Sequence, residues 1–262
     1  MRITAVINQK GGVGKTTTTV NLGAALARKG LRVLLIDLDP QANLTAHLMM
    51  DHAQVRSTTY DLLMGNAPLA DVARPTATEG LFLVPSAGDL AGAEVELANE
   101  IGREYFLKDR LRKDDERAAV FDEVLVDCPP SLGLLAINAL TAADEALIPL
   151  QAEFFALQGM ARYLEVQNLV KGRLNPNLRL GGIVICMWKG QANLSHEVRE
   201  EVKKSFGEVL FETVIRQNVK LAEAPSAGKT IFEYAADSNG AQDYEALAEE
   251  FLARRGVPKP TA

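Results

Sequence analysis

A glycine-rich segment near the N-terminus contains the residue types that bind phosphate groups. Residues 7–17 read Ile-Asn-Gln-Lys-Gly-Gly-Val-Gly-Lys-Thr-Thr, between an apolar run and a segment with helical period. In such a loop, successive backbone N–H groups can surround a phosphate, because the glycines let the main chain approach it closely. Lys15 can then reach the β and γ phosphates, and the Thr16 hydroxyl can bind Mg²⁺.

The loop departs from the common Gly-x-x-x-x-Gly-Lys-Ser/Thr motif at its start. Gln9 stands where the first glycine is expected, and Lys10 follows it. A glycine turn with two solvated lysines is the structural alternative, but the position between strand and helix favours phosphate binding. The predicted nucleotide-contacting residues of the loop are Lys10, Gly11, Gly12, Val13, Gly14, Lys15, Thr16 and Thr17.

Carboxylates follow two of the apolar runs. Asp37 and Asp39 come directly after residues 32–36, and Asp127 comes after residues 123–126. If these runs are parallel strands, the three side chains lie at the carboxyl edge of the sheet, where α/β proteins bind ligands. Each site has a simpler alternative, since an aspartate beside a proline can merely end a strand.

Short apolar runs alternate with stretches of helical period, which predicts a parallel sheet covered by helices on both faces. The expected strands are residues 3–7, 32–36, 81–84, 123–126, 145–150, 182–187 and 209–215, and the expected helices are residues 16–29, 156–171, 194–206 and 243–254. We therefore predict an α/β fold with a mostly parallel, twisted sheet. A single domain is expected over residues 1–255, followed by a flexible tail at 256–262, where Pro258 and Pro260 forbid a helix.

The composition excludes several classes of protein. Of the 262 residues, 47% are hydrophobic and 24% charged, as in a globular protein. No run approaches the ~18 to 20 apolar residues that cross a bilayer, and no apolar targeting segment begins the chain, so we expect a cytosolic protein. The net charge of −6 argues at first against a nucleic-acid partner.

The cysteines and histidines carry no predicted chemistry. Cys128 and Cys186 lie in apolar runs, so we expect them to be reduced core residues. His47, His52 and His196 are scattered without the spacing of metal ligands, and we expect most of them at the surface.

The loop with its additional Lys10 resembles the deviant Walker A motif of the ParA/MinD group of P-loop ATPases, and the resemblance extends over nearly the whole chain. It implies a P-loop NTPase fold that hydrolyses ATP to ADP and phosphate with Mg²⁺. In that group the residue matching Lys10 contacts the ATP of a second subunit, which implies a homodimer that forms on ATP binding. A cation beside the γ phosphate stabilises its negative charge more strongly in a water-poor interface than in water.

The resemblance also assigns roles to the carboxylates. Asp39, in the sequence Asp-Leu-Asp-Pro-Gln, matches the residue that positions the attacking water, and Asp37 matches the one near Mg²⁺. Asp127, before Cys-Pro-Pro, is similar to the Walker B acid that holds a magnesium-bound water. The implied catalytic residues are Lys10, Lys15 and Asp39, and the implied metal-binding residues are Thr16, Asp37 and Asp127.

Two branches of the group fit the chain less well. A MinD-like protein attaches to membranes through a basic amphipathic helix at its C-terminus. Here the apolar stripe of residues 243–254 lies opposite acidic residues, which anionic lipid would repel, so we expect it to pack on the core. Relatives of the nitrogenase iron protein bind a cluster through cysteines in glycine-rich loops, and neither cysteine of this chain lies in one.

Partition ATPases of the ParA/Soj type match more of the chain. The supporting segments are residues 6–21, 37–45, 125–138, 148–159, 193–206 and 218–229. The first strand begins at the N-terminus, so we expect no DNA-binding extension before it. The resemblance implies non-specific DNA binding by the ATP dimer on the nucleoid, a ParB-like partner, and segregation of a chromosome or plasmid. A MinD-like or orphan ParA-like ATPase that positions a membrane or protein cargo is the alternative.

The distribution of charge bears on the DNA. Residues 171–220, which we call the basic stretch, contain nine basic and five acidic side chains, although the whole chain carries −6. Two positions that are commonly DNA-contacting arginines in the family are Gln191 and Lys220 here, so we expect weaker DNA binding than is usual in the family, or a contact surface shifted to Arg216 and its neighbours. Asn218 matches the family's adenine contact, and Arg216 replaces its proline neighbour. The predicted DNA contacts are Lys189, Lys203, Arg216 and Lys220, and the predicted base-pocket residues are Arg216 and Asn218.

Overall fold

The computed structural model describes residues 1–48, 55–112, 120–153 and 156–256. Its strands are β1 (Arg2–Val6), β2 (Val33–Asp37), β3 (Arg74–Pro75), β4 (Leu81–Val84), β5 (Glu123–Asp127), β6 (Glu145–Gln151), β7 (Arg179–Trp188) and β8 (Leu210–Arg216). Its α-helices are α1 (Lys15–Arg28), α2 (Asn43–Leu48), α3 (Thr59–Met64), α4 (Leu69–Val72), α5 (Leu90–Leu97), α6 (Phe106–Arg112), α7 (Leu134–Ala142), α8 (Ala156–Arg173), α9 (Asn193–Phe206), α10 (Val219–Glu223), α11 (Ile231–Tyr234) and α12 (Asn239–Arg254).

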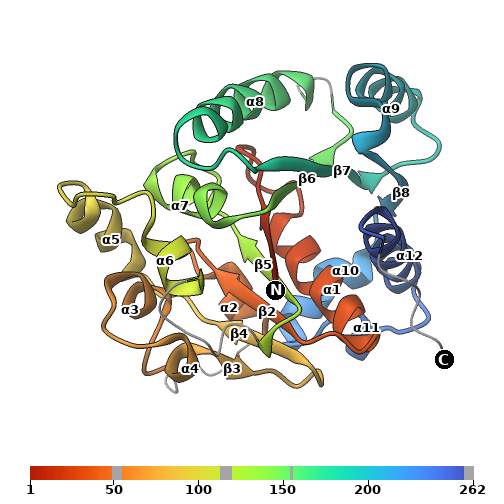
Figure 1. Ribbon diagram of the computed structural model, residues 1–262. Coiled ribbons are helices and arrows are strands. Elements are labelled where there is room, and N and C mark those ends of the chain that lie inside the picture. Colours follow the sequence, from red (N-terminus) through yellow and green to blue (C-terminus); the bar gives the residue numbers. More distant parts are fainter. Residues whose placement is uncertain (49–54, 113–119, 154–155, 257–262) are drawn as a thin grey trace.

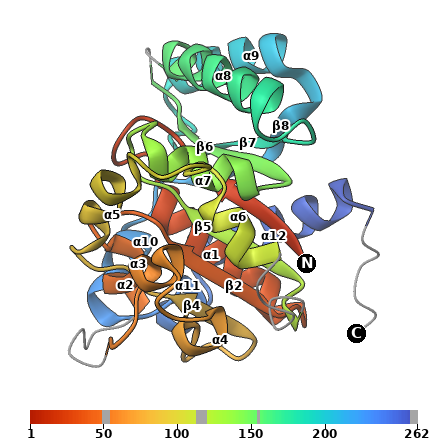
Figure 2. The same ribbon diagram turned by 60° about the vertical axis from the view of Figure 1, so that its left-hand side comes forward.

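The strands form one sheet in the order β3-β4-β2-β5-β1-β6-β7-β8. Every neighbouring pair is parallel except β3 and β4. Helices α1, α11 and α12 lie on one side of the sheet and α6, α7 and α8 on the other (Figure 1, Figure 2). This is the predicted mostly parallel α/β fold with helices on both faces.

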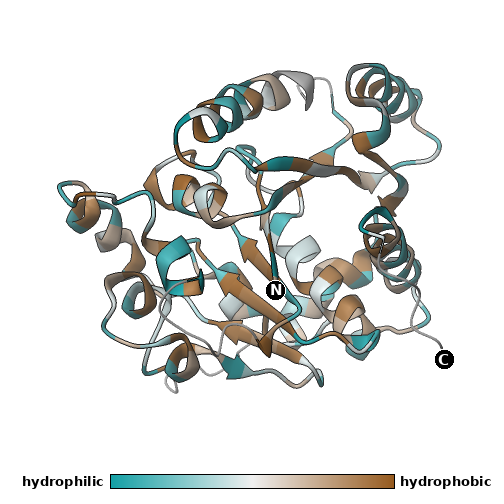
Figure 3. Cartoon of the chain, viewed as in Figure 1, coloured by the Kyte–Doolittle hydropathy of each residue, from teal (hydrophilic) through white to brown (hydrophobic). Residues whose placement is uncertain are grey.

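Apolar side chains on both faces of the strands explain why the sheet lies inside the molecule. In β1, Ile3 and Ala5 belong to the core under α7, whereas Val6 belongs to the core under α1. The hydrophobic residues concentrate on the strands, while α8 and α9 alternate hydrophobic and hydrophilic positions (Figure 3). Strands buried on both faces carry near-continuous apolar runs, and this made them recognisable in the sequence.

Helix α12 confirms one prediction and corrects another. Its stripe is buried against α1 and β8, as expected of a helix packed on the core, at Tyr244, Leu247, Ala248, Phe251 and Leu252. The helix begins at Asn239 rather than at residue 243, because the Ser238 side chain caps it by accepting a hydrogen bond from the Ala241 N–H. No helix of the described residues is long and apolar enough to cross a membrane.

Smaller differences concern residues that the sequence pattern did not resolve. Cys128 and Cys186 are free and buried, as predicted. His47 is buried rather than at the surface, and its Nε2 lies within hydrogen-bond distance, 2.9 Å, of the Lys229 carbonyl oxygen. His196 is exposed, whereas His52 and the tail from residue 257 lie outside the described residues. The single-domain limits stay a prediction.

Candidate nucleotide-binding site

The loop between β1 and α1 has the backbone conformation of a phosphate cradle. Gly12 and Gly14 adopt left-handed φ angles of 74° and 97°, which residues with a side chain rarely adopt. Gly14 is the N-cap of α1 and provides no side-chain hydrogen bond, so the first N–H groups of the helix are left for a ligand. Gly11 and Gly12 are exposed, with open space around them.

The Lys15 side chain lies inside the site and is almost fully buried. Its side chain donates from Nζ to the Lys10 carbonyl oxygen at 3.3 Å, and the residue is 8% exposed. Burial lowers the pKa of Lys15, and the carboxylates of Asp127 and Asp39 partly oppose this shift. Within the described ranges Lys15 forms no ion pair, so its charge is available to an anionic ligand.

Asp127 lies beside the start of α1 because β5 pairs with both β1 and β2. Its carboxylate accepts hydrogen bonds from the hydroxyls of Thr16 at 2.7 Å and Thr19 at 3.3 Å. Asp37 is its direct partner in the sheet register. Burial, followed by the negative charge of Asp37, raises the pKa of Asp127 to about 8. A cation at this position would relieve that repulsion.

Asp37 and Asp39 are fixed by the turn that follows β2. Asp37 accepts from the Thr45 N–H and hydroxyl at 2.8 and 2.7 Å, and from the Asp39 N–H at 3.2 Å. Burial raises the pKa of Asp37 to about 6. Asp39, which is 9% exposed, accepts from the Gln41 N–H at 2.9 Å, so its carboxylate is held at the rim of the site.

The donor set fits Mg²⁺ bound together with a phosphate ligand. Thr16, Asp37 and Asp127 offer hydroxyl and carboxylate oxygens, the ligands that Mg²⁺ prefers. In the part of the chain that the structure describes, no three His, Cys, Asp or Glu side chains form a metal cage. A magnesium ion with few protein ligands that keeps several waters and binds substrate phosphates needs no such cage.

Lys10 lies at the outer rim, away from the buried carboxylates. Its ammonium group forms an ion pair with Glu153, and its N–H donates to Asn8 Oδ1 at 3.0 Å. Both side chains of the ion pair are about half exposed, at 50% and 46%. Sequence reasoning missed Glu153, and no local signal could have found it, because it follows β6 far along the chain.

A pocket of about 280 Å³ adjoins the phosphate loop at Gly14 and Thr17. Its walls are mainly apolar and include Tyr244, and Asn218 lies among its polar residues. Met187, which sequence analysis did not identify, lines it with a left-handed φ of 54°, an unusual conformation for a non-glycine residue. A purine base attached to a phosphate in the loop would fit a pocket of this size and position.

The two predicted base-pocket residues have roles in the fold as well. Asn218 caps α10 by accepting a hydrogen bond from the Lys220 N–H at 2.8 Å. The Arg216 guanidinium pairs with Asp243 at 2.6 Å, and the Arg216 N–H also donates to that carboxylate. Both residues line the pocket.

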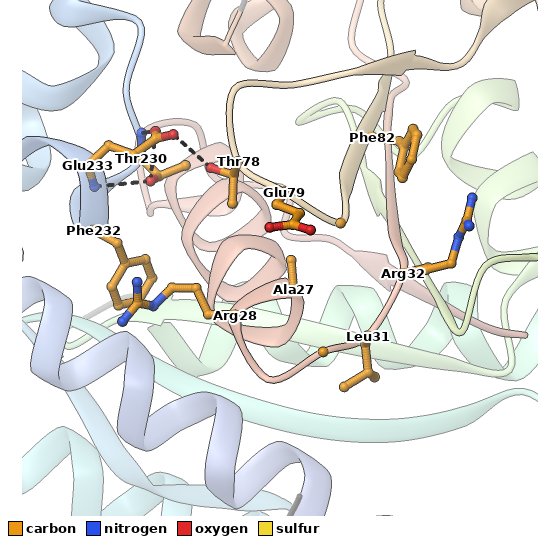
Figure 4. A pocket seen from close by; sticks show the side chains of 12 residues that line it. Ala27, Arg28, Leu31, Arg32, Thr78, Glu79, Phe82, Thr230, Phe232 and Glu233 are labelled. Carbon is orange, nitrogen blue, oxygen red and sulfur yellow. Dashed lines mark hydrogen bonds between the residues drawn. The ribbon is translucent and has the colours of Figure 1, made fainter. Parts of the chain in front are cut away.

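A larger hollow lies elsewhere, at the C-terminal end of α1. It measures about 760 Å³, and Figure 4 shows Arg28 beside Phe232 at one end and Arg32 near Phe82 at the other. None of the predicted site residues lines it. Size alone therefore does not identify the site in this molecule.

The predicted DNA-contacting cations are largely paired with carboxylates. Lys203 lies 3.4 Å from Glu212, and Lys220 lies 2.9 Å from Glu223. Arg216 pairs with Asp243 as described above. Lys189 is exposed, without an ion pair among the described residues. The basic stretch therefore presents less free positive charge than its composition indicates.

Comparisons with known proteins agree with this geometry. A family model described as an AAA domain matches residues 1–180. The chromosome partitioning protein ParA of Myxococcus xanthus is 46% identical over 258 residues, covering 98% of this chain and 90% of that protein. The chromosome-partitioning ATPase Soj of Treponema pallidum is 46% identical over 250 residues, covering 95% of this chain and 96% of that protein. This chain belongs to the ParA/Soj family.

The fold of this ParA/Soj family member also matches solved structures. One is cobyrinic acid a,c-diamide synthase from Mycobacterium smegmatis with bound ADP and magnesium, with a TM-score of 0.83 and 35% sequence identity. The match covers 100% of this chain and 98% of that one.

Proposed function

We propose that the protein is a magnesium-dependent ATPase whose ATP-bound form dimerises and binds DNA. The observation that carries the ATPase proposal is the gathering of Lys15, Thr16, Asp37, Asp39 and Asp127 around one glycine loop at the carboxyl edge of the sheet. Lys15, a buried lysine with no ion pair in the described part of the chain, and two carboxylates with raised pKa values complement a metal-bound triphosphate.

In the proposed reaction, water attacks the γ phosphate and releases ADP and phosphate. The loop N–H groups and Lys15 bind the phosphates, while Thr16, Asp37 and Asp127 would hold Mg²⁺, which neutralises phosphate charge when bound. Asp39 accepts a hydrogen bond from the attacking water and orients it. No covalent intermediate is needed, because positioning and charge neutralisation account for most catalysis of this kind.

The adenine base is assigned to the pocket beside Gly14. Its apolar walls can contact the faces of the base, and the Asn218 amide can donate to and accept from a base edge. The phosphate loop and this pocket are adjacent, so one nucleotide can occupy both.

Dimerisation is assigned to Lys10. Because its ammonium group lies at the rim and is half exposed, it can leave Glu153 and bind the phosphates of ATP in a second subunit. An exposed ion pair contributes little to stability, so this exchange costs little. The nucleotide then controls assembly, since only ATP supplies the γ phosphate.

DNA is the proposed partner of the dimer, with a ParB-like protein that stimulates hydrolysis, in the cytoplasm at the nucleoid. The names of the relatives and the basic stretch support this proposal. Two-fold pairing would double each basic surface and make DNA affinity depend on ATP. The pairing of Lys203, Arg216 and Lys220 with carboxylates favours a second candidate, a ParA-like ATPase that positions a protein cargo.

The test combines an ATP hydrolysis assay with a gel shift of random-sequence duplex DNA. We expect hydrolysis that requires Mg²⁺, and a shift with ATP but not ADP that weakens from low to physiological salt. Absence of hydrolysis would refute the ATPase proposal. Hydrolysis without any DNA shift, even at low salt, would reject DNA and leave the protein-cargo candidate.

A further inference from the structure

A small hollow at the amino edge of the sheet is lined by four arginines and one carboxylate. It measures about 230 Å³, and its arginines are Arg2, Arg179, Arg254 and Arg255. Arg2 and Arg179 begin β1 and β7, whereas the phosphate loop follows the other end of β1. The hollow is therefore separate from the nucleotide site, and none of its residues lines the pocket beside the phosphate loop.

Arg254 is a fixed wall of this hollow. Its guanidinium lies 4.0 Å from the centre of the Phe211 ring and donates to the carbonyl oxygens of Glu208 at 2.9 Å and Leu210 at 2.6 Å. It also pairs with Glu250 at 2.7 Å. These contacts hold the guanidinium in one place.

Arg255 is held still more firmly. Its guanidinium lies 3.7 Å from the centre of the Phe251 ring, and its side chain is 5% exposed. It pairs with Glu123 and Glu145 and donates to the Thr4 hydroxyl at 2.7 Å. Glu145 packs closely over Gly181 of β7, where an added Cβ would lie only 2.6 Å from the Glu145 carboxyl carbon.

Arg2 and Arg179 are left with free donor groups. Arg2 is exposed and forms no ion pair within the described residues. Arg179 has a 65% exposed side chain and only a loose contact of 3.6 Å with Glu145, whose carboxylate is already engaged by Arg255. Three carboxylates contact the four arginines, so the hollow keeps an excess of positive charge.

We propose that this hollow is a second anion site, in which Arg2 and Arg179 bind a phosphate-type oxyanion. A guanidinium presents its N–H donors in a planar fork that matches two oxygens of a phosphate. Arg254 and Arg255, held in place by their ring and carboxylate contacts, form the wall behind it. The ligand is a phosphate group, either of a free phosphate compound or of the DNA backbone.

The test removes the competing site and measures calorimetric binding of inorganic phosphate and pyrophosphate to the Lys15→Ala protein. We expect saturable binding of pyrophosphate that weakens by about tenfold or more in Lys15→Ala/Arg179→Ala and in Lys15→Ala/Arg2→Ala. Arg173→Ala is the matched control, because Arg173 is an exposed arginine of the same stretch that does not line the hollow. Arg179→Lys keeps the charge but not the fork, so it should recover only part of the affinity.

A second arm titrates the same proteins with a short DNA duplex at low salt. Loss of duplex binding with Arg2→Ala and Arg179→Ala, but not Arg173→Ala, would assign the site to backbone phosphate. Binding of pyrophosphate alone would assign it to a free phosphate compound. The proposal is overturned if Lys15→Ala alone removes all phosphate and DNA binding, or if Arg173→Ala weakens it as much as Arg179→Ala does. Either result leaves the proposed ATPase unaffected.

Discussion

At the nucleotide site the buried charged side chains have no ion-pair partner among the described residues, whereas in the basic stretch carboxylates neutralise several cations. Lys15 is almost buried, and within the described ranges it has no ion pair, while Asp127 has a pKa raised to about 8. In the basic stretch, Arg216 pairs with Asp243 and Lys203 with Glu212. A buried charge without a partner is costly, so it marks a place that a ligand completes. A surface charge that is already paired does not indicate a ligand site.

The largest effect is expected for Lys15→Ala at the nucleotide site. Loss of its contacts to two phosphates should lower ATP affinity by about 100-fold, measured with a fluorescent ATP analogue. Lys29→Ala, at the other end of α1, removes a lysine that pairs with Glu245 and should leave ATP affinity unchanged. The comparison fails if Lys15→Ala binds ATP within threefold of the parent protein.

Asp39→Ala separates binding from chemistry. We expect turnover to fall by about 100-fold in single-turnover assays, because the attacking water loses its orienting acceptor. ATP affinity should stay within a few-fold. Asp71→Ala, on the exposed surface of α4, is the control. Undiminished hydrolysis in Asp39→Ala would mean that another carboxylate positions the water.

Variants of Asn218 test whether one side chain both caps α10 and contacts the adenine base. Asn218→Ala should lower ATP affinity by about tenfold and also destabilise α10, since an N-cap contributes about 1 kcal/mol. Asn218→Ser restores the cap but not the amide, so it should recover thermal stability while ATP affinity stays low. Recovery of both properties in the serine variant would remove Asn218 from the base pocket.

The smallest effect is expected in the basic stretch, from Glu212→Gln. This change frees Arg199 and Lys203, which pair with Glu212. DNA affinity of the ATP form should rise about two- to threefold with a steeper salt dependence, while the unfolding midpoint stays within about 2 °C. Glu79→Gln makes the same change of net charge at an exposed glutamate on the turn before β4 and should have no effect. Equal gains in both variants would show that only overall charge matters.

The sequence was sufficient for every described strand except β3, and for the loop, because both are local patterns. Buried strands carry apolar runs, and residues 10–17 are contiguous, so their geometry follows from their own types. The sequence analysis did not predict the two-residue β3 or the short helices α2 to α7, α10 and α11, which have too few residues to show a clear period. The start of α12 was missed because residues 239–242 are polar or small, and Ser238 alone signals it.

Tertiary partners could not be predicted in the same way. Glu153 reaches Lys10, and Glu145 reaches Arg255, across more than a hundred residues of sequence. Met187 enters the base pocket only because β7 and β8 are neighbours in the sheet. The composition of the basic stretch predicted more free positive charge than the structure has. Asp243 and Glu223, which pair with Arg216 and Lys220, lie outside residues 171–220, so the composition of that stretch did not include them.

The central claim is that ATP, through Lys10, controls assembly of this ParA/Soj family member. Sedimentation velocity of the Asp39→Ala protein with MgATP, with MgADP and without nucleotide tests it directly. We predict a dimer with MgATP only, and a monomer in all three conditions for Lys10→Ala/Asp39→Ala with ATP affinity unchanged. Glu153→Gln/Asp39→Ala, which frees Lys10 without removing it, should still dimerise. A dimer that forms equally without ATP, or one that persists with Lys10→Ala, would contradict the account.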